Sequence, residues 1–132
     1  MNKTFIILTF LIAIVLSACT GSIKVGMLYG KWNYVKVGVP NSSPPDTVTK
    51  AELEVNKPFI NFSKNGQFNI IWGGKILSHG TYELSGSNIK VRENLSGGKT
   101  RDFQFYVSDL TNRSITFETT GQGGSRVTAL KE

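Results

Sequence analysis

The feature that most constrains this chain is a two-residue alternation of apolar and polar side chains, broken at short intervals by glycine. In the segment 67–72, Phe68, Ile70 and Trp72 face one way and the polar Gln67 and Asn69 face the other, and the segments 89–92, 102–108 and 115–118 show a similar pattern. Such alternation is typical of antiparallel strands with one face in a core and the other in solvent. The glycine-rich clusters between them recur at roughly 8- to 12-residue intervals, as in all-β sandwiches and barrels.

The number of alternating segments favours a closed sheet. Asn65-Gly66 predicts a hairpin that joins 59–63 to 67–72. We count about eight such strands joined mostly by tight turns, and a sheet of this kind usually closes because closure removes its exposed edges. We therefore predict one all-β domain over 28–132, an antiparallel up-and-down barrel of about eight strands with one short helix. No room remains for a second domain.

Two irregular places carry specific expectations. In the first strand, Lys31–Val39, Trp32 and Tyr34 share one face, whereas the valines that follow share the other, so we expect a bulge after Tyr34. After the proline-rich loop 40–45, the segment Thr49–Val55 fits either a short helix capped by Thr49 or an edge strand. Its Ala-Glu-Leu-Glu sequence favours the helix, because these residues are poor strand formers.

Residues 1–18 have the features of a targeting segment. Lys3 precedes the apolar run Phe5–Leu16, which is shorter than the roughly 20 residues of a membrane-spanning helix. The small residues Ser17 and Ala18 then lead to Cys19, the only cysteine of the chain. A lone cysteine in an exported protein forms no internal disulfide, so its presence needs another explanation.

The sequence Leu16-Ser17-Ala18-Cys19 resembles the lipobox of bacterial lipoproteins. This resemblance implies cleavage before Cys19, acylation of that residue as the membrane anchor, and a tether over 19–27. The alternative is an ordinary secretory signal that leaves a free thiol. Because no aspartate or acidic cluster follows Cys19, we expect a lipid-anchored protein of the cell envelope, in the outer membrane and facing the periplasm.

A second resemblance concerns the predicted barrel. Gly30-Lys31-Trp32 resembles the G-x-W element of lipocalins, in which the tryptophan plugs the closed end of the barrel. In that family a late arginine packs across the tryptophan, and Arg126 is the matching residue here. Together with the hairpin Pro58–Phe68 and the strand Gly80–Leu84, these motifs make 28–130 similar to the lipocalin-like domains of small Bacteroidota lipoproteins.

Few residues suggest chemistry. The single histidine, His79, has no recognisable nucleophile or acid partner, and the carboxylates are scattered over separate strands and turns. We therefore expect no enzyme activity, no metal site and no cofactor. The net charge of +6 comes from lysines and arginines spread along the chain, which argues against nucleic acid as a partner.

The aromatic residues with an inward phase are the candidates for ligand binding: Phe68, Trp72, Tyr82, Phe103, Phe105 and Phe117. Each large ring buries about 150–250 Å², so we expect the rings to fill most of the barrel and leave a small cavity or none. Two functions remain open. One is a carrier of a small hydrophobic ligand held at a ring-lined barrel mouth. The other is a non-catalytic envelope interaction or accessory module with a filled barrel, acting through Pro40–Asp46 and Leu95–Lys99.

Overall fold

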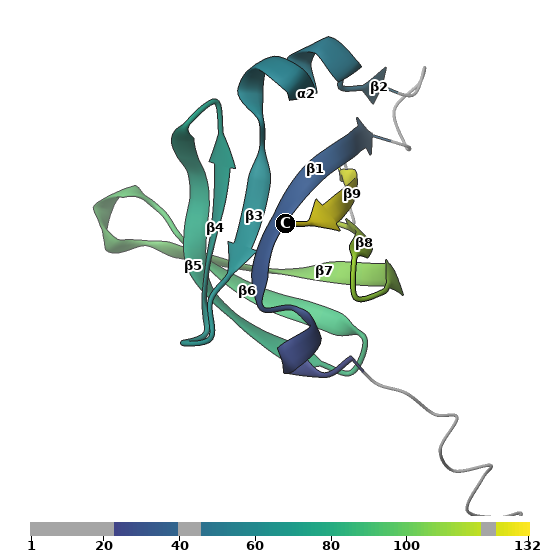
Figure 1. Ribbon diagram of the computed structural model, residues 1–132. Helices are drawn as coiled ribbons and strands as arrows, with labels where there is room; N and C mark the ends of the chain where they lie inside the picture. The colour runs from purple at the N-terminus through teal and green to yellow at the C-terminus, as the bar shows by residue number, and fades with distance from the viewer. Residues whose placement is uncertain (1–22, 40–45, 120–123) are drawn as a thin grey trace, which may run out of the picture.

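The computed structural model describes residues 23–39, 46–119 and 124–132. Within these residues nine antiparallel strands form one sheet that closes on itself (Figure 1). Eight of them, β1 and β3 to β9, make the barrel wall, because β1 pairs with β3 on one side and with β9 on the other. The predicted all-β barrel is confirmed. The segment 1–18, Cys19 and the loop 40–45 lie outside the described residues.

Each wall strand after β1 pairs with the next one along the chain, as the up-and-down prediction requires. The strands are β1 (Gly30–Val39), β2 (Asp46–Thr47), β3 (Phe59–Phe62), β4 (Gln67–Trp72), β5 (Lys75–Ser85), β6 (Asn88–Asn94), β7 (Thr100–Leu110), β8 (Ser114–Glu118) and β9 (Arg126–Lys131). The helical segments are η1 (Val25–Met27), α2 (Lys50–Asn56) and η2 (Ser96–Gly98).

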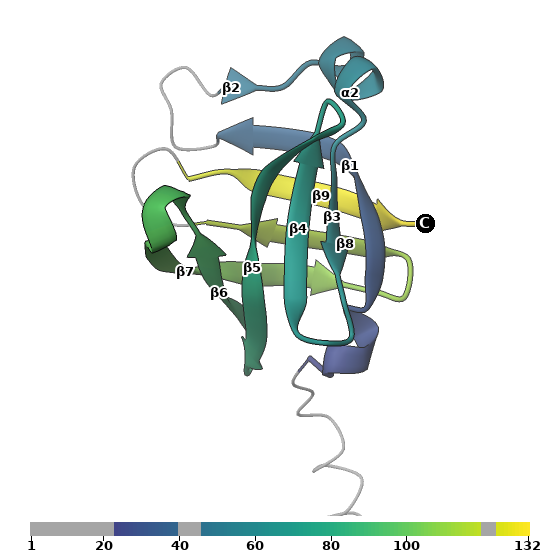
Figure 2. The ribbon, with the colours of Figure 1, turned by 90° about the vertical axis from the view of Figure 1, so that its left-hand side faces the viewer.

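The two ends of the barrel differ. The η1 turn lies at one end and α2 at the other (Figure 2). Because successive strands run in opposite directions, the β3–β4, β5–β6 and β7–β8 turns share the end with η1. The β4–β5 turn, η2 and α2 belong to the opposite end, where Gly73 N donates to Asn56 O at 2.8 Å. We call the η1 end the closed end and the other end the mouth.

The irregular first strand has the predicted bulge. The register between β1 and β9 shifts between Tyr34 and Lys36, which leaves Val35 as the extra residue. Val35 is exposed, and Val37 packs against the core cluster on the same side as Tyr34. One inserted residue thus reverses the phase of the alternation, as a bulge does.

The segment after Thr49 is a helix, so the edge-strand alternative is wrong. The Thr49 hydroxyl accepts a hydrogen bond from Glu52 N at 3.2 Å and caps the first turn of α2. Lys57 ends the helix in a left-handed conformation, and its N–H donates to Leu53 O. Leu53 is partly buried against the barrel core, which fixes the helix beside β1.

The closed half of the barrel is filled by side chains. Trp32 has no exposed surface, and its Nε1–H donates to Leu28 O at 2.9 Å. The Phe62 and Tyr82 rings meet edge to face at 4.9 Å between centroids, and the Tyr82 hydroxyl donates to Ser63 O at 2.7 Å. Trp32 therefore lies where the lipocalin resemblance expects a plug.

The expected stack of Arg126 on Trp32 is wrong. Arg126 pairs with Gly38 at the mouth end of β1, and its Nε donates to Glu118 Oε2 at 2.9 Å. The cation over the tryptophan is Lys131, whose Nζ lies 5.2 Å from the ring centroid. The reason is direction: β9 runs antiparallel to β1, so only its last residues reach the closed end.

Candidate ligand cavity

The mouth half of the barrel contains a cavity of about 610 Å³ that opens to solvent. Its size lies within the range of roughly 300–1,000 Å³ that is usual for small-molecule sites. The expectation of a small cavity or none is therefore wrong for this half. Large rings fill the closed half, whereas at the mouth small or polar residues take several inner positions. The principal lining side chains are Tyr34, Val37, Ile70, Trp72, Leu77, Ser78, Glu93, Arg101, Phe103, Phe105, Phe117 and Val127.

The structure divides the six predicted ligand-binding residues into two groups. Trp72, Phe103, Phe105 and Phe117 line the cavity. The Phe105 ring lies 4.7 Å from that of Phe117 and 5.4 Å from that of Phe103, between centroids, so three of the four form one continuous wall. Phe68 and Tyr82 are buried and contribute to the packed core without lining the cavity.

Ser78, Glu93 and Arg101 form a linked polar group in the cavity wall, and the sequence reasoning missed them. Ser78 and Glu93 are buried, the Ser78 hydroxyl donates to Glu93 Oε2, and Arg101 Nη2 donates to Glu93 Oε1 at 2.5 Å. The alternation of inward and outward residues along β6 and β7 identifies two of them, Glu93 and Arg101. The inward positions Ile89 and Val91 continue to Glu93, and the inward Phe103 and Phe105 extend back to Arg101.

Tyr34 brings a buried phenol to the same cavity. Its ring meets Phe117 edge to face at 6.3 Å between centroids. Burial raises the pKa of Tyr34 well above its usual value of 10.0, because the phenolate would lose its hydration. In the unfolded chain the phenol ionises near pH 10, whereas in the barrel it stays protonated.

This difference predicts a loss of stability in alkali. Because the folded-state pKa of Tyr34 lies above the unfolded value, its contribution to the free energy of unfolding is intact below about pH 10. Above that pH the contribution falls progressively, by up to about 1.4 kcal/mol per pH unit. Tyr34→Phe is expected to lose this part of the pH dependence. Urea midpoints of both proteins from about pH 8 to pH 11 measure the difference. Burial also raises the pKa of Tyr82, so some decline remains in the variant. Parallel curves for the two proteins would contradict the prediction.

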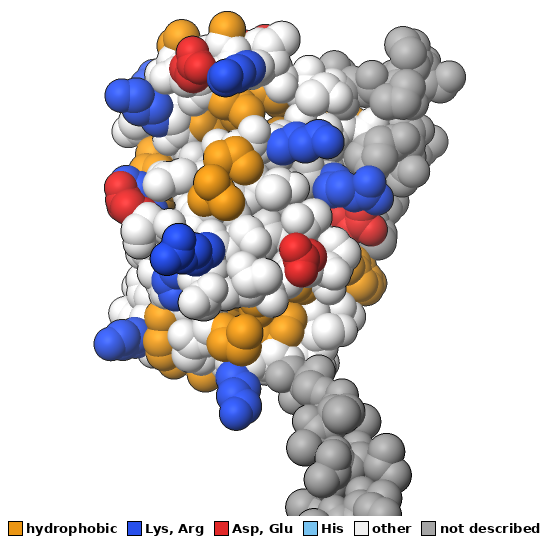
Figure 3. Space-filling model, turned by 45° about the vertical axis from the view of Figure 1, so that its right-hand side comes forward, with side chains coloured by type: hydrophobic (Ala, Val, Ile, Leu, Met, Phe, Trp, Pro, Cys, Tyr) orange, Lys and Arg blue, Asp and Glu red, His pale blue; other side chains and the backbone are white. Residues whose placement is uncertain are grey.

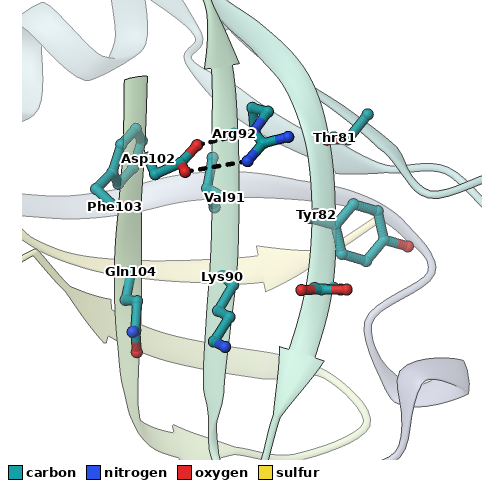
Figure 4. Close-up of a pocket in the computed structure, with 9 residues that line it drawn as sticks. Thr81, Tyr82, Lys90, Val91, Arg92, Asp102, Phe103 and Gln104 are labelled. Atoms are coloured by element: carbon teal, nitrogen blue, oxygen red, sulfur yellow. Dashed lines mark hydrogen bonds and ion pairs between the residues drawn. The ribbon is translucent and has the colours of Figure 1, made fainter. Parts of the chain in front are cut away.

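Two other hollows lie outside the barrel. One, of about 600 Å³, covers the outer face of β5, β6 and β7 (Figure 4). There the exposed Arg92 holds Asp102 through two hydrogen bonds of 2.9 and 3.2 Å, and this bonding lowers the pKa of Asp102. The other, of about 780 Å³, lies between α2 and the outer side of β1, β3 and β4. Both lie against the outer face of the sheet and have a more polar lining, so the barrel cavity, with its aromatic lining, is the better candidate site.

Among the described residues, the remaining surface shows no cluster of charged or metal-binding side chains. On the face shown in Figure 3, lysine and arginine side chains are spread among acidic and uncharged ones. His79 is exposed on the outer face of β5, opposite Asn69. In the part of the chain that the structure describes, no group of histidine, cysteine and acidic residues is arranged to hold a metal ion. Nor does any helix within 23–39, 46–119 or 124–132 have the length and apolar character needed to cross a membrane.

The closed sheet, the tryptophan plug and the mouth cavity together define a lipocalin-like barrel. No family model matches the sequence, and no curated protein matches it. Solved structures that share the fold include two Bacteroides proteins. A lipocalin-like protein from Bacteroides uniformis is 20% identical, with a TM-score of 0.51 over 79% of this chain and 98% of that one. An uncharacterized protein from Bacteroides eggerthii is also 20% identical, with a TM-score of 0.52 over 80% and 99%.

Proposed function

We propose that this chain is an envelope lipoprotein whose barrel binds a small hydrophobic ligand at its mouth. The observation that carries the proposal is the cavity of about 610 Å³, walled by Trp72, Phe103, Phe105 and Phe117. Water that lies against such rings is displaced favourably by an apolar ligand. The closed end is packed, so the ligand enters and leaves through the mouth.

The anchor in this proposal is acylated Cys19, and the place is the outer membrane, facing the periplasm. The lipobox-like sequence Leu16-Ser17-Ala18-Cys19 supports this anchor. Stable anchoring requires more than one acyl chain, and lipoprotein modification supplies them. The fold shared with a lipocalin-like protein from Bacteroides uniformis supports the ligand-binding barrel of this proposal. The role is binding without catalysis.

The test uses the chain from Thr20 onward, because every described strand and core residue follows Ser22. Native mass spectrometry is expected to show a bound mass that denaturation removes. Titration calorimetry with dodecanol, an uncharged apolar probe, is expected to give saturable binding. Trp72→Ala should weaken this binding at least about tenfold, because it removes a ring from the cavity wall.

The matched control is Ile76→Ala, on the neighbouring strand β5 and exposed outside the cavity, which is expected to bind dodecanol as the wild type does. Urea midpoints confirm that both variants are folded. If dodecanol binds Trp72→Ala as tightly as it binds the wild type, the cavity is not the site. The loops at the mouth, which include Leu95–Lys99, then become the place to look for a protein partner.

A further inference from the structure

Three of the polar residues that line the cavity form one wall across three neighbouring strands. Ser78 comes from β5, Glu93 from β6 and Arg101 from β7. In the sheet register Glu93 is directly opposite Arg101 on one side and Gly80 on the other. The rings of Trp72, Phe105 and Phe117 line the same cavity. A ligand there meets an apolar surface and a charged one together.

Both carboxylate oxygens of Glu93 already have hydrogen-bond partners in the protein. Its side chain is only 10% exposed, and each carboxylate oxygen accepts a hydrogen bond, one from Arg101 and one from Ser78. A buried carboxylate is costly to leave unpaired. A cationic ligand would have to displace Arg101 to reach it. The structure therefore assigns Glu93 and Ser78 to positioning the arginine.

Arg101 is the charged group that faces the mouth. Its side chain is 64% exposed, and the guanidinium carbon lies 5.6 Å from the Phe103 ring centroid. A guanidinium has five N–H donors. Among the described residues, Arg101 donates a side-chain hydrogen bond only to Glu93. The other donors are available to a ligand, and Glu93 and Phe103 hold the group in place.

We propose, on the basis of the proposed function, that Arg101 selects an amphipathic ligand with an anionic head group, a carboxylate. The apolar part lies against Trp72, Phe105 and Phe117, and the head meets the guanidinium at the mouth. The planar fork of an arginine matches a carboxylate through two parallel hydrogen bonds. Glu93 and Arg101 are the only charged side chains lining the cavity among the described residues, so no second cation favours a dianion.

The test compares probes that share one alkyl chain and differ in the head: dodecanoate, dodecanol and dodecylamine, titrated calorimetrically into the chain from Thr20 onward. The wild type is expected to bind dodecanoate at least about tenfold more tightly than the other two. Arg101→Gln should lose about tenfold in dodecanoate affinity and leave dodecanol affinity within about twofold. Dodecyl phosphate is expected to bind more weakly than dodecanoate.

The chain supplies a matched control in Arg92, which pairs with Asp102 on the outer face of β6 and β7. Arg92→Gln removes the same charge from the same sheet without touching the cavity, so dodecanoate affinity should not change. Equal losses in Arg92→Gln and Arg101→Gln would show a general effect of net charge and overturn the assignment.

The other outcomes separate this inference from the function itself. Saturable dodecanol binding that Trp72→Ala weakens, with no preference for dodecanoate, overturns the head-group assignment and leaves the ligand cavity standing. A preference for dodecylamine that Glu93→Gln abolishes would show that the ligand's head group is cationic. Tighter binding of dodecyl phosphate than of dodecanoate would show that the head group is a phosphate. If none of the probes binds, both proposals are refuted.

Discussion

Replacing Trp32 with alanine is expected to lower the free energy of unfolding by about 3–5 kcal/mol. The side chain is completely buried at the closed end, and its Nε1–H satisfies Leu28 O at 2.9 Å. Alanine leaves a large cavity under η1 and a carbonyl without its partner. Since small domains have a total stability of about 5–15 kcal/mol, this single change removes a large part of it.

Urea unfolding followed by circular dichroism measures the effect of Trp32→Ala. The matched comparison is Trp72→Ala, which removes the same side chain from a partly exposed position at the mouth and is expected to cost less. Trp32→Phe keeps a ring and loses the hydrogen bond, so it should fall between the wild type and Trp32→Ala. Equal losses at the two tryptophans would show that the closed end is not the packed part of the barrel.

Replacing Gly80 with alanine is expected to cost at least about 3 kcal/mol, the upper end of the usual range for overpacking. Gly80 lies on β5, which has β4 on one side and β6 on the other, and it is directly opposite Phe68 on β4 and Glu93 on β6. A Cβ here would lie 1.9 Å from Arg92 O and 2.9 Å from Arg92 C. These are backbone atoms of the next strand, so relief requires the two strands to separate.

The control for Gly80→Ala is Gly26→Ala, because a Cβ at Gly26 has nothing within 4 Å. We expect Gly26→Ala to change the free energy of unfolding by less than about 0.5 kcal/mol. Urea midpoints compare the two variants. Gly80→Ala should also weaken dodecanoate binding, because it displaces Glu93 and with it Arg101. A stable Gly80→Ala variant would mean that β5 and β6 approach each other less closely than described.

The local features of the fold were predictable because their causes are local. The Asn65-Gly66 hairpin, the bulge after Tyr34 and the helix capped by Thr49 each depend on a few neighbouring residues. Closure of the sheet followed from the number of strands and the cost of exposed edges.

Features that depend on register across the chain were harder to predict. Choosing Lys131 over Arg126 as the cation beside Trp32 requires knowing how β9 pairs with β1, which no single strand shows. The contact between Glu93 and Arg101 is an intermediate case. The alternation points both side chains inward, but polar residues at the end of an apolar row are easily assigned to solvent. The cavity volume depends on how far the strands spread at the mouth, and side-chain sizes alone overestimated the filling.

The position of η1 determines the direction in which this barrel faces. The described chain enters at the η1 end of the barrel, opposite α2 (Figure 2). Trp32 is packed at that end beside Leu28, and the cavity lies at the mouth. An anchor at Cys19 would place the bilayer beneath the plug and turn the mouth toward the aqueous space. In that orientation a ligand of the proposed cavity would enter from solution, or from a surface across the gap, and not sideways out of the lipid leaflet that holds the anchor.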